Sequence, residues 1–266
     1  MCGKGTTVVV LAAAVLLTRP VPAEAASADD IVAKSQRAYF YAGSDMKARV
    51  LMTLASAGGQ KRTRELTMLR RNKGDAGEQQ YFMYFHQPAD VKAMTFLVEK
   101  YPNKDDDRWL FIPGINMVKR IAARDAAQSF VGSDFTYEHV SGRDLDADEH
   151  RLLPDEKVEG KDCHVVESVP RSAAEYKRKR AWIDKSTLLP LKEEYFDGKG
   201  ELFKAFKADE VRSIGGVPTV IRRTMTNRKT GHTTTVSFTD VAYDAGIEAD
   251  IFTERYLRDP PGRWIK

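Results

Sequence analysis

Apolar and polar residues alternate with a period of two along most of the chain beyond residue 44. The segment DMKARVLMTL, residues 45–54, has apolar side chains at almost every second position, with Lys47, Arg49 and Thr53 between them. Such alternation is typical of a β-strand with one buried face. Similar runs recur between turns rich in Gly, Pro and Asp. Further strands are expected near residues 62–71, 79–87, 94–101, 108–112, 117–122, 163–169, 178–184, 190–196, 201–211, 218–227 and 233–243.

Only one long stretch has helical periodicity. Residues 29–42 place Ile31, Val32, Ala38 and Tyr39 on one face, and the acidic pair Asp29-Asp30 suits the positive N-terminal end of a helix. No long helical pattern separates the later strands, so crossover connections and a parallel sheet are not expected. The pattern predicts a mainly β (α+β) protein with one large, curved antiparallel sheet that is partly closed into a barrel.

Three of the expected strands are apolar on both faces. They lie in QYFMYFH at residues 80–86, MTFLVEKY at 94–101 and DRWLFIPG at 107–114. A strand that is apolar on both sides needs cover on both. One face can pack on helices, and the other must meet a second protein layer, as in an ordinary core, or enclose a cavity.

The first 25 residues have the features of a secretory signal peptide. Lys4 precedes the apolar run TTVVVLAAAVLL at residues 6–17, and Ala23-Glu24-Ala25 forms an A-x-A cleavage site. A retained N-terminal anchor is the alternative. We expect cleavage near Ala25, export to the periplasm, and a mature single domain over residues 26–266, because no fixed-period repeat or low-complexity linker divides the chain.

Composition limits the chemistry. The formal net charge of +4 is mildly basic and identifies no partner. Cys2 belongs to the predicted signal peptide, so Cys163 remains alone, and neither an intramolecular disulfide nor a cysteine-based metal site is expected. Cys163 is interpreted as a small buried apolar side chain.

No motif of catalysis or metal binding stands out. There is no G-x-S-x-G sequence, and the five histidines are scattered without an H-x-H or H-x-x-x-H pair. Asp144, Asp146 and Asp148 have the spacing of the first calcium-loop ligands, but Glu149 and Asp155 stand where a calcium loop needs Gly and Glu. A solvated acidic loop is therefore expected, with no catalytic residue, metal or cofactor.

The basic run KRKR at residues 177–180 is interpreted as a solvated edge strand protected by its lysines. Anionic lipid headgroups are the alternative partner of this run. Nucleic acid is not expected to bind an exported protein of this kind.

Four pieces of the chain together resemble the LolA-like outer membrane lipoprotein-sorting protein family. These are the signal peptide, DRWLFIPG followed by MVKRI, SFVGSDFTYEHV at residues 129–140, and IDKSTLLPLKEEYFDGKGEL at residues 183–202. The resemblance runs from about Asp29 to Arg258. It implies an unclosed antiparallel β-barrel with helices over the opening, an apolar cavity for acyl chains and no catalytic residues. In the classical carrier an Arg in the lid region is linked to ligand release; here Arg124 and Arg143 are only neighbours of the lid.

The resemblance also implies a lid. Residues 125–140 would form short helical segments in RDAAQSF and SDFTYEHV, with Asp134 capping the second. The candidate cavity lining is Met83, Phe85, Met94, Phe96, Trp109, Phe111 and Met117, and the candidate lid residues are Phe130, Phe135 and Tyr137. A register error of one residue would exchange the face of every lining position.

The expected function is that of a periplasmic, non-enzymatic carrier or chaperone. Its cargo would be a lipid or the acyl chains of a lipoprotein, transferred between envelope membranes or to an inner-membrane export-type transporter, with peripheral membrane contact. The alternative is a periplasmic sensor or adaptor, which should expose an apolar patch for a membrane partner. An enzyme is the third hypothesis, and it predicts a cluster of titratable groups inside the pocket.

Overall fold

A computed structural model describes residues 1–3, 5, 26–74, 77–102 and 104–265 of the protein. The signal-peptide prediction rests on residues 6–25, which lie outside the described residues. Across the described ranges, none of the helices combines the length and apolar character that crossing a membrane requires.

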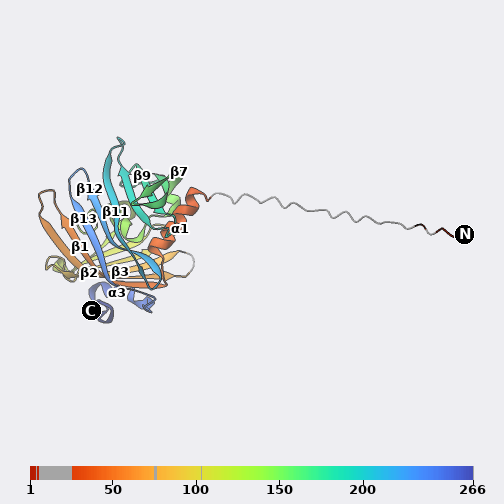
Figure 1. The fold of residues 1–266 in the computed structure, drawn as a ribbon. Coiled ribbons are helices and arrows are strands. Elements are labelled where there is room, and N and C mark those ends of the chain that lie inside the picture. Colours follow the sequence, from red (N-terminus) through yellow and green to blue (C-terminus); the bar gives the residue numbers. More distant parts are fainter. Residues whose placement is uncertain (4, 6–25, 75–76, 103, 266) are drawn as a thin grey trace.

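The described chain forms one curved, antiparallel, 13-stranded sheet, shown in Figure 1. The strand order is β6-β5-β4-β3-β2-β1-β13-β12-β11-β10-β9-β8-β7, so two meanders meet where β1 pairs with β13. Since β6 and β7 are the two edges and do not pair, the barrel is unclosed. The predicted fold class, a mainly β protein with an unclosed antiparallel barrel, is confirmed.

The first meander contains β1 (Asp45–Ala55), β2 (Lys61–Lys73), β3 (Glu78–Gln87), β4 (Thr95–Lys100), β5 (Asp107–Ile112) and β6 (Met117–Ile121). The second contains β7 (Asp148–Val158), β8 (Lys161–Pro170), β9 (Arg178–Asp184), β10 (Pro190–Phe196), β11 (Leu202–Ile214), β12 (Val217–Asn227) and β13 (Thr233–Tyr243). The α-helices are α1 (Ala28–Phe40), α2 (Tyr137–Ser141), α3 (Arg255–Arg258) and α4 (Gly262–Ile265). Short 3-10 turns are η1 (Pro113–Ile115), η2 (Ala123–Asp125), η3 (Leu145–Ala147) and η4 (Ala249–Ile251).

The sequence pattern missed β7, and it found the residues of β9 but wrongly placed that strand at an edge of the sheet. The acidic stretch expected to be a solvated loop instead leads through η3 into β7, whose register shifts between Leu153 and Glu156, around Pro154. An exposed edge strand with a proline break has little alternation to detect. The KRKR run is not at an edge, because β9 lies between β8 and β10. Arg178 and Arg180 both pair with Glu167.

Helix α1 is built as its sequence predicts. Ser27 and Asp30 form a reciprocal capping box at its start, which satisfies N–H groups of the first turn. At its end, the Arg70 guanidinium donates to the backbone oxygens of Phe40 and Ala42, which no helical N–H can reach. The buried Ile31 packs in a small apolar cluster with Val166, Ala181 and Ile183 of β8 and β9, so α1 covers that part of the sheet.

The C-terminal segment covers the outer face of the first meander (Figure 1). Its apolar residues form one cluster with the outer faces of β2 to β5: Leu69, Phe82, Leu97, Phe111, Ile247, Ile251, Phe252, Leu257 and Trp264. The buried Asp45 carboxylate fixes the start of the segment by accepting the N–H groups of Ala245, Gly246 and Ile247 at 2.7, 3.0 and 2.9 Å. These strands are apolar on both faces because both faces are covered. The Cys163 thiol is buried, as predicted.

Candidate functional site

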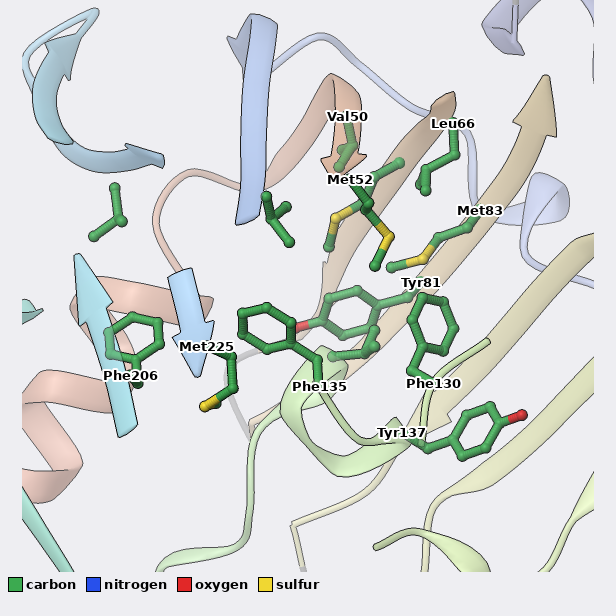
Figure 2. Packing of buried hydrophobic residues seen from close by; sticks show 14 of the residues in the cluster. Val50, Met52, Leu66, Tyr81, Met83, Phe130, Phe135, Tyr137, Phe206 and Met225 are labelled. Atoms are coloured by element: carbon green, nitrogen blue, oxygen red, sulfur yellow. The ribbon is translucent and has the colours of Figure 1, made fainter. Parts of the chain in front are cut away.

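The inner face of the sheet is lined by methionine, aromatic and aliphatic side chains. Directly paired residues on antiparallel neighbours share a face. The register pairs Met83 with both Met68 and Phe96, and it pairs Val50 with Leu66. Figure 2 shows Val50, Met52, Leu66 and Met83 converging on one apolar space inside the sheet.

The segment between the two edge strands, residues 122–147, folds over this face, and we call it the lid. A tight turn at its tip places Val131 and Gly132 at φ values of 45° and 77°, and the Phe130 N–H donates to the Phe135 oxygen at 2.8 Å across the turn. This turn directs Phe130 and Phe135 toward the methionines of β1 and β3 (Figure 2). The Phe130 ring lies 5.2 Å from Phe96 and 5.6 Å from Tyr137, which joins the lid to β4.

Helix α2 of the lid is capped by Thr136, and not by Asp134 as expected. The Thr136 hydroxyl accepts the His139 N–H, and the His139 ring accepts the Thr136 N–H at 2.9 Å. The Asp134 carboxylate instead lies 2.6 Å from the His232 ring and accepts the Thr234 hydroxyl at 2.7 Å. Asp134 therefore ties the lid tip to β13. The first expected lid helix is only the 3-10 turn η2.

The C-terminal end of the lid is attached to a buried ion pair at the start of β5. Arg108 donates to Asp106 at 2.6 Å, and their side chains are only 5% and 4% exposed. The Ser141 hydroxyl of α2 donates to the same carboxylate at 3.1 Å. Beyond it, Gly142 at φ +82° lies against Phe40 of α1, and a Cβ there would come within 2.9 Å of the ring. Glycine therefore allows the lid and α1 to touch.

Three cavities lie under the lid and α1, with volumes of about 60, 110 and 40 Å³. They adjoin, because they share lining residues, and Arg223 of β12 lines all three. Each can hold water, but all are far below the ~300–1,000 Å³ of typical ligand pockets. The lid side chains thus fill most of the space at these three cavities, and the lid lies closed over them in this structure.

A chain of polar contacts joins α2 to β10 beside the second cavity. Since the His139 Nδ1 accepts the Thr136 N–H, the ring proton lies on Nε2, which faces the Tyr195 hydroxyl at 3.2 Å. Tyr195 donates to Glu193 at 2.5 Å. Lys204 donates to the Asp134 backbone oxygen and pairs with Glu175. These contacts stabilise the closed lid.

The His139 ring is held neutral. Its burial, together with the positive charges of Lys204, Lys179 and Arg223, lowers its pKa well below the ordinary value. An unfolded histidine titrates near ~6.5, so the unfolded chain binds the proton first as the pH falls. The stabilising effect of neutral His139 is therefore complete above about pH 6.5 and decreases below it until the pH reaches the folded pKa.

We expect the free energy of unfolding to fall on acidification by up to ~1.4 kcal/mol per pH unit from His139. Burial raises the pKa of Glu175, which acts in the opposite direction, so the comparison of variants isolates the histidine. Urea unfolding of wild type and His139→Asn between pH 7.5 and 5 measures it, with His164→Asn on β8 as control. Parallel pH profiles for wild type and His139→Asn would contradict the assignment.

Seven of the ten sequence-predicted site residues lie together in the inner cluster: Met83, Phe85, Met94, Phe96, Phe130, Phe135 and Tyr137. The placement of Trp109 and Phe111 on this face was wrong. The register pairs Trp109 with Leu97 and Phe111 with Thr95, so both belong to the outer face under the C-terminal segment. Leu110, which pairs with Phe96, takes the inner position. Met117 begins the edge strand β6 and is 41% exposed. Ligand contact by the seven stays a prediction.

Sequence reasoning missed the polar residues of the interior. Arg223, His139 and Tyr195 come from β12, the lid and β10, and nothing in their local spacing connects them. The only signal was that the charged Arg223 lies two residues from the inward-facing Met225 and therefore on the same face of the strand. Such a position is easily taken for the polar face of a strand. Among the described residues, no group of three or more His, Cys, Asp or Glu is arranged to hold a metal ion.

Comparisons with known proteins agree on the fold. A family model described as "-like: Uncharacterized protein" matches residues 77–259. A DUF1329 family protein from Desulfovibrio piger has a TM-score of 0.80 and 28% identity, over 86% of this chain and 97% of that one. A putative outer membrane lipoprotein-sorting protein domain from Vibrio parahaemolyticus has a TM-score of 0.80 and 28% identity, over 87% and 98%.

A LolA superfamily protein from Nitrosomonas europaea shares the fold, with a TM-score of 0.69 and 19% identity over 87% of this chain and all of that one. Among curated proteins, none matches the chain.

Proposed function

We propose that this chain, which shares its fold with a DUF1329 family protein and with a putative outer membrane lipoprotein-sorting protein domain, is a non-enzymatic periplasmic carrier or chaperone for a lipid or lipidated cargo. The observation that carries the proposal is the apolar inner face of the half-barrel, which a lid closes with its own aromatic side chains. Acyl chains would take the place of Phe130 and Phe135 when the lid lifts. The Vibrio parahaemolyticus domain, named for lipoprotein sorting, supports the same role.

The chemistry of the inner face suits acyl chains. Met52, Met68 and Met83 line one cavity with Phe135, and unbranched thioether side chains adapt their shape to a flexible ligand. Burial of an acyl chain is worth at most ~0.8 kcal/mol per methylene group. This cavity has a volume of about 40 Å³, which is too small for such a chain, so binding between these methionines and Phe135 requires the lid to move away from the sheet.

The anchors of the lid are consistent with such a movement. Polar contacts hold its two parts separately, through Asp134 at the tip and Asp106 with Ser141 at the C-terminal end. Between them the lid contacts the sheet through apolar rings, which an acyl chain can replace, and through the hydrogen bond between His139 and Tyr195, which must break when the lid lifts. The cargo would pass to another envelope membrane or to an inner-membrane export-type transporter.

A sensor or adaptor remains the second candidate. It would hold a membrane partner on an exposed apolar surface. Within the described ranges, the large exposed apolar residues of the strands and their turns are spread over several places: Leu51 on β1, Ile115 and Met117 at the turn into β6, Leu152 on β7 and Val169 on β8. This arrangement favours the carrier.

The titratable cluster that an enzyme would need is present beside the second cavity, formed by His139, Glu193 and Tyr195. These groups are hydrogen-bonded to one another, from His139 to Tyr195 and from Tyr195 to Glu193. Their contacts serve to hold the lid, and for this reason the proposal remains non-enzymatic.

Native mass spectrometry tests the proposal on protein purified from a periplasm without detergent, followed by lipid extraction. A carrier is expected to retain a species of defined lipid mass, or to take up added phospholipid or acylated peptide. Protein that is empty and refuses both would overturn the carrier. Co-purification with one membrane protein would then support the sensor.

A further inference from the structure

Arg223 carries a positive charge at the junction of the three interior cavities. It extends from β12 toward the rings of Tyr39, Phe135 and Phe238, with its guanidinium carbon 5.5, 5.3 and 5.0 Å from the three ring centres. It donates one hydrogen bond, to the Tyr39 hydroxyl. Its Nε is buried and has no hydrogen-bond partner. An arginine has five N–H donors, so Arg223 has donors that no acceptor of the described protein binds.

No carboxylate of the described chain lies within ion-pair distance of Arg223. The neighbouring acids of the second cavity already have cations. Glu193 lies 3.5 Å from Lys179, and Glu138 accepts Arg143 at 2.7 Å. Glu175, which contacts the same polar chain, pairs with Lys204 at 2.5 Å. Among the described residues, two arginines line these cavities without a carboxylate within ion-pair distance. Arg70 donates to the backbone oxygens of Phe40 and Ala42, whereas Arg223 lies among aromatic rings and donates only to the Tyr39 hydroxyl.

An unpaired charge in an apolar interior is unfavourable, and ring faces compensate only part of the lost hydration. A guanidinium binds carboxylate and phosphate oxygens through paired N–H donors, and these charge-assisted bonds are stronger than neutral ones. An anion that enters with an acyl chain would supply the missing partner. The apolar space of Met52, Leu66 and Met83 adjoins Arg223 and would take the chain.

We propose that Arg223 is the binding site for the oxyanion headgroup, carboxylate or phosphate, of an acyl-chain amphiphile whose chain occupies the space under the lid. This inference rests on the proposed carrier function and narrows its cargo to anionic amphiphiles. Phe135 and Tyr39 flank the headgroup, so lid closure and headgroup capture occur at the same place.

The test measures affinities of four probes with the same 16-carbon chain for the mature protein. The probes are palmitate, hexadecyl phosphate, hexadecanol and hexadecyltrimethylammonium, each followed by titration calorimetry below its aggregation concentration. We expect an anionic probe to bind at least tenfold more tightly than hexadecanol, because charge-assisted hydrogen bonds to the guanidinium are stronger than neutral ones. The tighter of the two anionic probes identifies the headgroup as carboxylate or phosphate.

Arg223→Met is expected to abolish the preference for the anion while hexadecanol still binds, and Arg223→Lys is expected to keep part of the preference. Arg222→Met is the matched control, because Arg222 is the next residue on the same strand, is half exposed and pairs with Glu210. Its preference should equal that of wild type. Thermal unfolding of each variant confirms that it folds.

The outcomes separate the inference from the proposed function. Equal affinity of wild type for hexadecanol and for both anionic probes would overturn the Arg223 site and leave the carrier standing. A preference that persists unchanged in folded Arg223→Met would also overturn it. Failure of folded wild type to bind any of the four probes would overturn both proposals.

Discussion

Replacing Asp106 with alanine is expected to lower the free energy of unfolding by about 3–5 kcal/mol, because it leaves the buried guanidinium of Arg108 without its counter-ion. The same carboxylate accepts the Tyr101 N–H and the Ser141 hydroxyl, both at 3.1 Å. The change therefore also removes the hydrogen bond from α2 of the lid to this carboxylate and leaves the longer contact of Ser141 with Arg108. Urea unfolding measures the loss, and proteolysis within residues 122–147 reports on the lid.

The adjacent residue provides a matched control. Asp107 pairs with Arg120, whose side chain is 69% exposed, and exposed ion pairs contribute only ~0–1 kcal/mol. Asp107→Ala should therefore be nearly neutral. Asp106→Leu combined with Arg108→Met, which removes both charges, should recover much of the lost stability. Equal losses for Asp106→Ala and Asp107→Ala would refute the role of the buried pair.

Replacing Phe135 with aspartate is expected to abolish acyl-chain binding. Phe135 lines two of the cavities and faces Arg223, so the new carboxylate would remove apolar contact and would also neutralise the cation. Loss of a buried aromatic contact alone is worth ~1.5–3 kcal/mol, which corresponds to roughly 10- to 100-fold in affinity. Binding of palmitate and hexadecanol to the folded variant measures the effect.

The variant Phe135→Leu separates the charge from the packing. Leucine keeps the apolar character of the position, so binding of hexadecanol should be largely retained. Near-wild-type binding by a folded Phe135→Asp variant would show that the ligand does not contact the lid, and residues 122–147 would then serve only to complete the core.

Both predictions depend on one property of the molecule: side chains of the lid form part of the hydrophobic core. In the closed form Phe130 and Phe135 are core residues, with 3% and 6% of their surface exposed. In an open form they would leave the sheet, and the cargo would cover the surface that they expose. The same side chains would then serve packing and binding in turn, so changes to them should affect both stability and affinity.

The order of strands along the chain was accessible from the sequence. Period-two alternation and Gly-containing turns depend on neighbours in the chain, so they located twelve strands and the helix ending at Phe40. They did not locate β7, because an exposed edge strand with a proline buries too little to create alternation. They also could not show whether the arginines of KRKR lie at an edge, since edge position depends on which strand pairs with which.

The inner face and its polar groups were decided only by the tertiary structure. A shift of one residue in the pairing register moves every side chain of a strand to the other face. In a segment that is apolar on both sides, the sequence therefore could not show that Leu110, and not Trp109, faces the interior. Arg223, Tyr39 and Phe135 lie far apart in the sequence and meet only because β12, α1 and the lid surround the same space. The sequence by itself determined an antiparallel half-barrel with an apolar interior, because burial patterns are local. The charge at its centre arose from long-range packing, which places Arg223 where no carboxylate of the described chain lies within ion-pair distance.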